Sequence, residues 1–189
     1  MMPSFKQKTC IWFLILFFAI STLATAQEAH LTNIIVTNTR DDFLIYFTVK
    51  GAFRGEIKKA ILSGVPTTFS FFVTLNLERR LWPDKEIADL KLTHTIKYDN
   101  LKQEFSIHRS WKNGKPDIAK SFEEAQKLMS EINGLKVLPL KQLEKGRRYQ
   151  LLAKAELSKL TLPLYLHYVL FFMSLWDFET DWYTVDFIY

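Results

Sequence analysis

Three carboxylates alternate near the end of the chain, at Asp177, Glu179 and Asp181. Side chains two positions apart in a strand point to the same face, so these three would form an acidic row. Such a row could bind calcium through its carboxylate oxygens, or a pair of its members could carry out acid–base catalysis. No second oxygen cluster lies nearby in the sequence, and we therefore favour a solvated or capping role.

Histidines are the next candidates for metal chemistry. The sequence has four, at positions 30, 94, 108 and 167, and no two of them have the spacing of metal ligands. His94 belongs to the apolar face of a predicted strand, whereas His108 has the opposite parity and should point to the other face. We expect packed or solvated histidines, and we predict neither a metal nor another cofactor.

A nucleophile is not indicated either. Ser63-Gly64-Val65-Pro66 is not a nucleophile elbow, because that motif has glycines on both sides of the serine. The sequence contains no glycine-rich phosphate loop. With no catalytic set visible, we predict that the protein is not an enzyme.

The first 26 residues have the layout of a secretory signal peptide. Two lysines, Lys6 and Lys8, precede the apolar run from Ile11 to Ile20, and Ala24-Thr25-Ala26 is a small-x-small cleavage site. The apolar stretch is shorter than the roughly 20 residues that span a bilayer. We predict cleavage before Gln27 and a periplasmic or extracellular protein, with an uncleaved inner-membrane anchor as the alternative.

Cleavage would leave residues 27–189 as one domain without thiols, because Cys10 is the only cysteine. Lys6 and Lys8 are the only charged residues that would be removed, so the formal net charge would fall from +5 to +3. This charge is too small to indicate binding to nucleic acid, which usually requires a concentrated basic face. Stability must then come from burial rather than from disulfides.

Alternating apolar and polar residues predict antiparallel strands that each have one buried face. These strands are residues 43–49, 69–77, 90–98, 149–157 and 183–189. Asp99-Asn100 is a candidate two-residue hairpin turn. Its register would place Leu92 opposite Ile107, His94 opposite Phe105 and Ile96 opposite Gln103.

Two segments have helical spacing instead. Residues 55–62 place three apolar residues on one stripe, and Gly64 would end that helix. Ser121 and Glu124 form a capping box before a second stripe, which consists of Phe122, Ala125, Leu128, Met129 and Ile132 and is closed by Asn133-Gly134. We predict a mainly β fold, an immunoglobulin-like antiparallel β-sandwich with two short inserted helices. The alternative is an α+β open antiparallel sheet with both helices on one face.

The end of the hairpin between the second and third predicted strands is the first candidate contact site. It contains Arg79, Arg80 and Trp82. Basic residues beside an exposed tryptophan suit a protein partner or an anionic membrane surface. The alternative is a solvated turn in which Trp82 folds back onto the sheet.

The segment from Leu162 to Trp176 is the most apolar part of the mature chain. We favour a buried strand, and the alternative is an exposed patch that contacts a membrane or a partner. Trp176 and Trp182 are further candidate contact residues. Trp182 is an equal candidate for the core, because Tyr183, Val185 and Phe187 compete for the inward face.

Four short motifs resemble the bacterial exported proteins of domain-of-unknown-function family 4390. They are Ser63-Gly64-Val65-Pro66, Arg79-Arg80-x-Trp82, Leu175-Trp176-Asp177-Phe178 and Thr180-Asp181-Trp182-Tyr183. The resemblance covers essentially the whole mature chain. It implies an exported domain without an assigned activity, often encoded beside a sensor kinase of the nitrogen-regulation type.

Three hypotheses about function follow. The first is an exported, non-enzymatic binding domain whose partner is a cell-envelope protein, with a sensor kinase as one candidate. Its contact residues would be Arg79, Arg80 and Trp82, then Trp176 and Trp182. The second is a periplasmic module that contacts membrane or lipid through residues 162–176. The third is an envelope enzyme that uses the acidic row.

Overall fold

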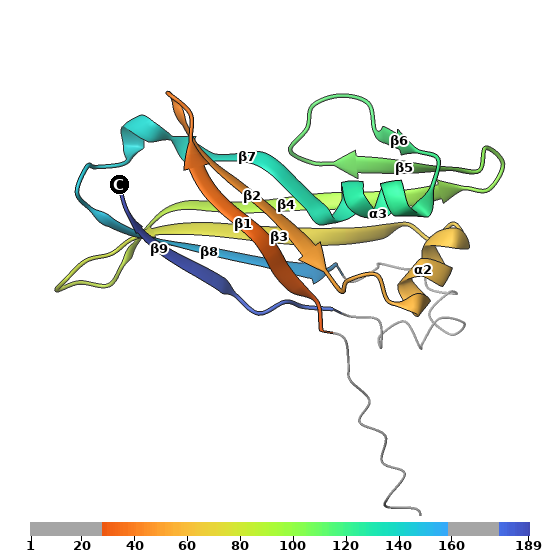
Figure 1. Ribbon diagram of the computed structural model, residues 1–189, viewed down its shortest axis with the longest axis horizontal. Coiled ribbons are helices and arrows are strands. Elements are labelled where there is room, and N and C mark those ends of the chain that lie inside the picture. Colours follow the sequence, from red (N-terminus) through yellow and green to blue (C-terminus); the bar gives the residue numbers. More distant parts are fainter. Residues whose placement is uncertain (1–27, 159–177) are drawn as a thin grey trace, which may run out of the picture.

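The computed structural model describes residues 28–158 and 178–189 (Figure 1). The strands are β1 (His30–Asn38), β2 (Asp42–Lys50), β3 (Thr67–Leu77), β4 (Lys85–Asp99), β5 (Glu104–Arg109), β6 (Asp117–Ala119), β7 (Glu131–Pro139), β8 (Arg148–Leu157) and β9 (Tyr183–Ile188). The helices are α2 (Gly55–Leu62) and α3 (Phe122–Ser130), and a 3₁₀ turn, η1 (Leu140–Gln142), follows β7. In the described part of the chain, no helix is long and apolar enough to cross a membrane.

The strands form two antiparallel sheets. The smaller sheet has the order β1-β2-β7 and the larger one β6-β5-β4-β3-β8-β9. β1 and β2 cross over one face of the larger sheet (Figure 1). Phe47 of β2 lies 6.0 Å from Phe71 of β3, and Phe43 stacks on Phe187 of β9 at 5.1 Å between ring centroids. The mainly β prediction with two short helices is confirmed.

The alternation that predicted β2, β3 and β8 corresponds to true burial. Every second residue of these strands faces the core, and in β3 the buried set includes Phe69, Phe71, Val73 and Leu75, all fully inaccessible. Burying a large apolar side chain contributes roughly 1.5–3 kcal/mol. These central strands therefore supply much of the stabilisation of the two-sheet arrangement.

The predicted register of the β4–β5 hairpin is wrong. Asp99 pairs with Glu104 and Ile96 with Ile107, so residues 100–103 form a four-residue connection rather than a two-residue turn. The Asp99 carboxylate accepts hydrogen bonds from the backbone N–H groups of Leu101 and Lys102, at 2.9 and 3.1 Å. This side-chain cap stabilises the longer turn. The register moves by an even number of residues, so inward and outward faces keep the predicted sides.

The predicted extent of the second helix is also wrong at its end. Ser121 caps α3 as expected, since its hydroxyl accepts the Glu124 backbone N–H at 3.1 Å. The Glu124 carboxylate, however, accepts the backbone N–H of Lys120 and not that of Ser121. The helix ends at Ser130, and Ile132 already belongs to β7, where it pairs with Phe47. Ile132 is buried as a strand residue, and its spacing from Leu128 and Met129 also fits the apolar face of a helix.

Candidate functional site

The hairpin end between β3 and β4 projects beyond the body of the two sheets (Figure 1). It is a turn fixed partly by Asp84, whose carboxylate accepts the Arg79 backbone N–H at 3.1 Å. Leu81 is 89% exposed and Trp82 is 73% exposed. Trp82 therefore does not fold back onto the sheet, and the alternative of a covered tryptophan is removed.

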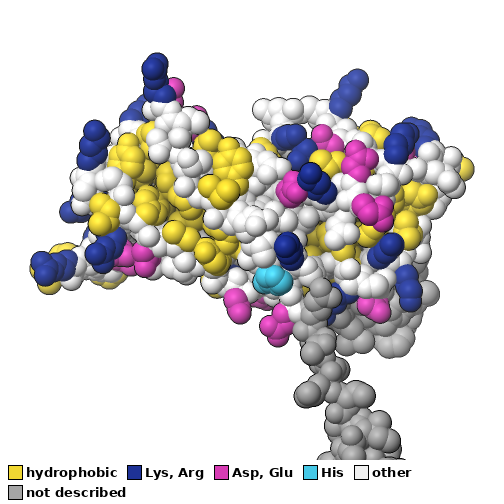
Figure 2. All heavy atoms as spheres, in the orientation of Figure 1, with side chains coloured by type: hydrophobic (Ala, Val, Ile, Leu, Met, Phe, Trp, Pro, Cys, Tyr) yellow, Lys and Arg dark blue, Asp and Glu magenta, His cyan; other side chains and the backbone are white. Residues whose placement is uncertain are grey.

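An open hollow of about 540 Å³ adjoins this turn. It is lined by Glu78, Arg79, Arg80, Asp84 and Arg148. Arg148 enters the hollow from β8, because the Glu78 backbone N–H donates to the Arg148 carbonyl at 3.0 Å. The lining has three guanidinium groups against two carboxylates, so its formal charge is positive. Basic and hydrophobic side chains lie together at this projecting end (Figure 2, lower left).

Trp182 lies at a different place on the larger sheet. It is 49% exposed and precedes β9, and its ring has the Lys154 ammonium nitrogen 5.5 Å from the centroid. The neighbouring pair Tyr183–Ala153 is at one end of the β8–β9 ladder, and Arg148 is at the other end. The structure therefore does not bring Trp82 and Trp182 into one site. Trp176 and residues 162–176 fall in the undescribed segment 159–177.

The acidic row is described only at Glu179 and Asp181, because Asp177 lies outside the described residues. Both side chains are exposed, and the intervening Thr180 is buried, so the predicted alternation is present. Lys154 forms an ion pair with Glu179 and compensates its charge. Within residues 28–158 and 178–189, no cluster of three or more histidine, cysteine or acidic side chains is arranged to hold a metal ion.

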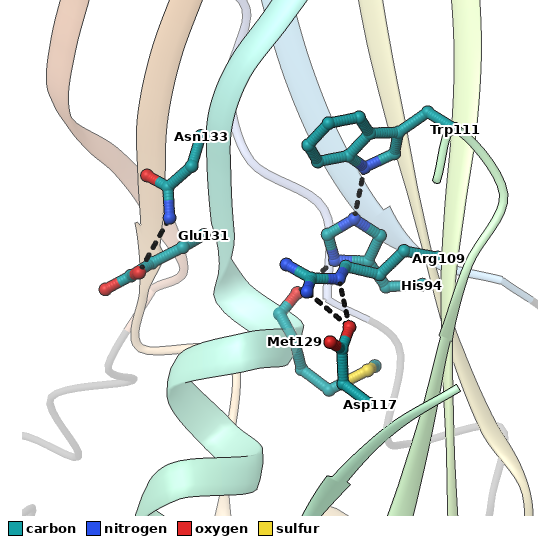
Figure 3. A network of polar contacts seen from close by, with 7 residues as sticks. All are labelled: His94, Arg109, Trp111, Asp117, Met129, Glu131 and Asn133. Carbon is teal, nitrogen blue, oxygen red and sulfur yellow. Dashed lines mark hydrogen bonds and ion pairs between the residues drawn. The ribbon is translucent and has the colours of Figure 1, made fainter. Parts of the chain in front are cut away.

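A buried polar cluster lies between the larger sheet and α3 (Figure 3). Its centre is His94 of β4, which has no exposed surface. His94 Nδ1 lies 2.9 Å from the Met129 carbonyl oxygen, and the Trp111 indole N–H donates to Nε2 at 2.9 Å. These partners require a neutral imidazole with its proton on Nδ1. Burial, reinforced by the positive charge of Arg109, lowers the His94 pKa from 6.5 to about 4.

Arg109 is the charged member of the same cluster. Its side chain is buried, and its guanidinium forms an ion pair with Asp117 of β6 that includes an Nε–Oδ2 hydrogen bond of 2.9 Å. Arg109 pairs with His94 across the β4–β5 ladder and lies 6.0 Å from the centre of the Trp111 ring. The cluster thus ties β4, β5, β6 and α3 together.

Sequence reasoning placed His94 on the buried face but did not find its partners. Both ring nitrogens of His94 are occupied by protein groups, and the ring is inaccessible. These contacts are those of a histidine packed in the core, with neither ring nitrogen open to solvent. The prediction that His94 is a packed histidine is confirmed.

A comparison with known protein families gives a match over almost the whole of residues 27–189. The family model described as Domain of unknown function (DUF4390) matches residues 26–186. A search of curated proteins and a search of solved structures gave no match.

Proposed function

The chain belongs to the DUF4390 family, and from this premise we propose that it is a non-enzymatic binding domain that engages a protein partner through its β3–β4 hairpin end. The hairpin end is defined here as residues 78–84. The observation that carries the proposal is the exposure of Leu81 and Trp82 at the projecting tip, beside Arg79 and Arg80. Tryptophan and arginine are the residue types most enriched among the energetic hot spots of protein interfaces.

Exposing these apolar side chains has no evident use for the stability of the domain. Burying a side chain of this size on association would contribute roughly 1.5–3 kcal/mol before the costs of association. The surrounding guanidinium groups can add hydrogen bonds and electrostatic selection of the partner. A protein interface would therefore use both kinds of side chain in this turn.

The proposed place of action is the cell envelope, and the proposed scaffold is an immunoglobulin-like sandwich. The layout of residues 1–26 supports export. The two antiparallel sheets, packed through pairs such as Phe47–Phe71, support the sandwich. An envelope sensor kinase is the proposed partner on the basis of the family resemblance alone.

Cross-linking in intact cells tests the proposal. Partners captured through a photoreactive residue at position 81 would be compared between the unchanged protein and the double variant Arg80→Ala, Trp82→Ala. The matched control is Leu101→Ala, Lys102→Ala, which removes another exposed apolar and basic pair from the β4–β5 turn. We expect loss of the captured partner only in the hairpin variant. If every captured protein persists in that variant, the hairpin end is not the contact site.

Contact with a membrane surface is the second candidate, because an exposed tryptophan beside arginines also suits the interface of an anionic bilayer. Flotation with vesicles, with and without anionic lipid, distinguishes it. Flotation that requires anionic lipid and is lost in Trp82→Ala would favour the membrane. Absence of flotation at low salt would remove this candidate.

A further inference from the structure

We propose that the hairpin end binds an acidic peptide segment of the partner, one that carries an apolar side chain among its carboxylates. This inference rests on the proposed function and specifies the chemistry of the partner. Its binding surface consists of the hairpin end together with Arg148 of β8 and Ile188 of β9.

Arginine is concentrated at this surface. Three of the seven arginines in the sequence line the same hollow, at positions 79, 80 and 148. No lysine of the described residues lines it, although lysines outnumber arginines in the whole chain. The planar guanidinium group donates two parallel hydrogen bonds to a carboxylate, which a lysine ammonium cannot do. The lining is therefore suited to carboxylates by geometry as well as by charge.

The acidic residues of the hollow already have partners within the protein. Asp84 accepts the backbone N–H of Arg79, and Glu78 lies 3.7 Å from the Arg148 guanidinium. In the described part of the chain, no carboxylate lies at ion-pair distance from the side chains of Arg79 or Arg80. These two guanidinium groups are exposed and can bind carboxylates of another chain.

Apolar side chains flank the arginines on two sides. Leu81 and Trp82 lie in the turn itself, and Ile188 is directly opposite Arg148 in the β8–β9 ladder. Side chains opposite each other across a ladder share one face of the sheet. Ile188 is 67% exposed there. A ligand that extends beyond the hollow could therefore reach apolar groups beside the guanidinium groups.

A peptide segment fits this arrangement better than a bilayer surface does. Arg148 belongs to a strand of the sheet and not to the projecting turn, so the basic groups surround a hollow instead of forming one flat plane. An extended chain can place a side chain in the hollow and its neighbours on the rim. In an extended segment, side chains two positions apart share a face, so a carboxylate and an apolar group at such a spacing could both contact this surface.

The test uses fluorescence anisotropy with a short labelled peptide of Asp-Asp-Leu-Leu repeats, in which each face of the extended chain carries both aspartate and leucine. The key variant is Arg79→Glu, Arg80→Glu. The matched control is Arg40→Glu, Lys115→Glu, which makes the same charge change in two other exposed turns. Far-ultraviolet circular dichroism and thermal unfolding establish that both variants fold. A peptide with asparagine in place of aspartate tests the need for carboxylates.

We expect the hairpin variant to raise the Kd for the aspartate–leucine peptide by about tenfold or more, and the control variant by less than about twofold. Binding should weaken with added salt, and the asparagine peptide should bind poorly. The charge-conserving variant Arg79→Lys, Arg80→Lys should bind the aspartate–leucine peptide about threefold more weakly, because it keeps the charge but loses the planar, two-donor geometry of the guanidinium group.

Equal losses in the two charge-reversal variants would overturn the inference, because net charge alone would then explain binding. So would binding to phosphatidylglycerol vesicles without binding to the peptide. If cross-linking at position 81 captures a partner that depends on Trp82 but tolerates Arg79→Glu, Arg80→Glu, the proposed function stands and the acidic-segment inference fails. Loss of capture in the arginine variant but not in the Arg40, Lys115 control supports both.

Discussion

Trp111 donates its indole N–H to Nε2 of His94 at 2.9 Å, while Nδ1 of the same ring lies 2.9 Å from the Met129 carbonyl oxygen. With both nitrogens engaged in this way, a second proton placed on Nε2 would have no hydrogen-bond acceptor. Protonation would turn Nε2 into a donor that faces the indole donor, within a site that already contains the Arg109 charge. The neutral ring is thus part of the native packing.

This relationship predicts that the protein loses stability in mild acid. The His94 pKa is about 4 in the folded state and 6.5 when unperturbed, so the unfolded chain binds more protons between these values. The His94 contribution is fully present above about pH 6.5 and is lost as the pH falls toward 4. The loss should reach about 3 kcal/mol in the free energy of unfolding. Urea unfolding at pH values from 7 to 4 measures this loss. In His94→Gln, the free energy of unfolding should fall less steeply with decreasing pH over the same range.

Removing the indole donor should weaken the cluster and raise the His94 pKa. Trp111→Phe keeps most of the ring but leaves Nε2 without its donor, at a cost of about 1–3 kcal/mol. Protonation no longer breaks this hydrogen bond, so the pKa should move upward from about 4. Nuclear magnetic resonance titration of the His94 ring follows the change. Trp82→Phe, at the exposed hairpin end, should change neither quantity.

The Arg109–Asp117 pair should matter far more than the exposed pairs. Asp117→Asn leaves the Arg109 guanidinium, buried in the cluster, without its countercharge. We expect a loss of about 2–4 kcal/mol in the free energy of unfolding. Lys120→Gln breaks the Lys120–Glu104 pair, whose lysine is largely exposed, and should cost less than about 1 kcal/mol. Similar losses in the two variants would show that burial does not set the strength of these pairs.

Gly134 should accept a side chain less well than Gly146 does. Its φ is +72°, and an added Cβ would lie 3.2 Å from the Tyr46 hydroxyl oxygen. Gly146 has a similar φ of +75° but open space around the Cβ position. Both Gly→Ala variants incur the backbone strain of about 1–2 kcal/mol, and only Gly134→Ala adds a close contact. Chemical unfolding should therefore rank Gly134→Ala below Gly146→Ala in stability.

Most of the strands that were predictable have one uninterrupted buried face, although β9 was predicted from the same alternation and none of its residues is buried. β2, β3 and β8 alternate without a break, and their pattern alone specifies which side faces the core. β1 does not, because a register shift between Thr32 and Ile35, with Asn33 at a φ of +53°, interrupts the alternation. β7 contains Asn133-Gly134, a pair that indicates a turn unless its pairing with β2 is known.

The candidate site was predictable only where it is local in sequence. Arg79, Arg80 and Trp82 are close together between two clear strands, so a hairpin end could be inferred. Arg148 and Ile188 join this surface through the β3–β8 and β8–β9 pairings, which the sequence does not reveal. The same limit applies to His94, whose acceptor carbonyl comes from a residue 35 positions later.

His94 also contacts the backbone at the C-terminal end of α3. The last carbonyl groups of a helix lack intrahelical donors, and the imidazole satisfies that of Met129 from another layer of the molecule. α3 ends at Ser130 and β7 begins at Glu131, with no connecting loop. One ring of the six-stranded sheet therefore binds the backbone two residues before a strand of the three-stranded sheet begins. A hydrogen bond therefore connects the two layers in addition to apolar packing. A shift of one layer relative to the other should change the strand pairing next to this hydrogen bond.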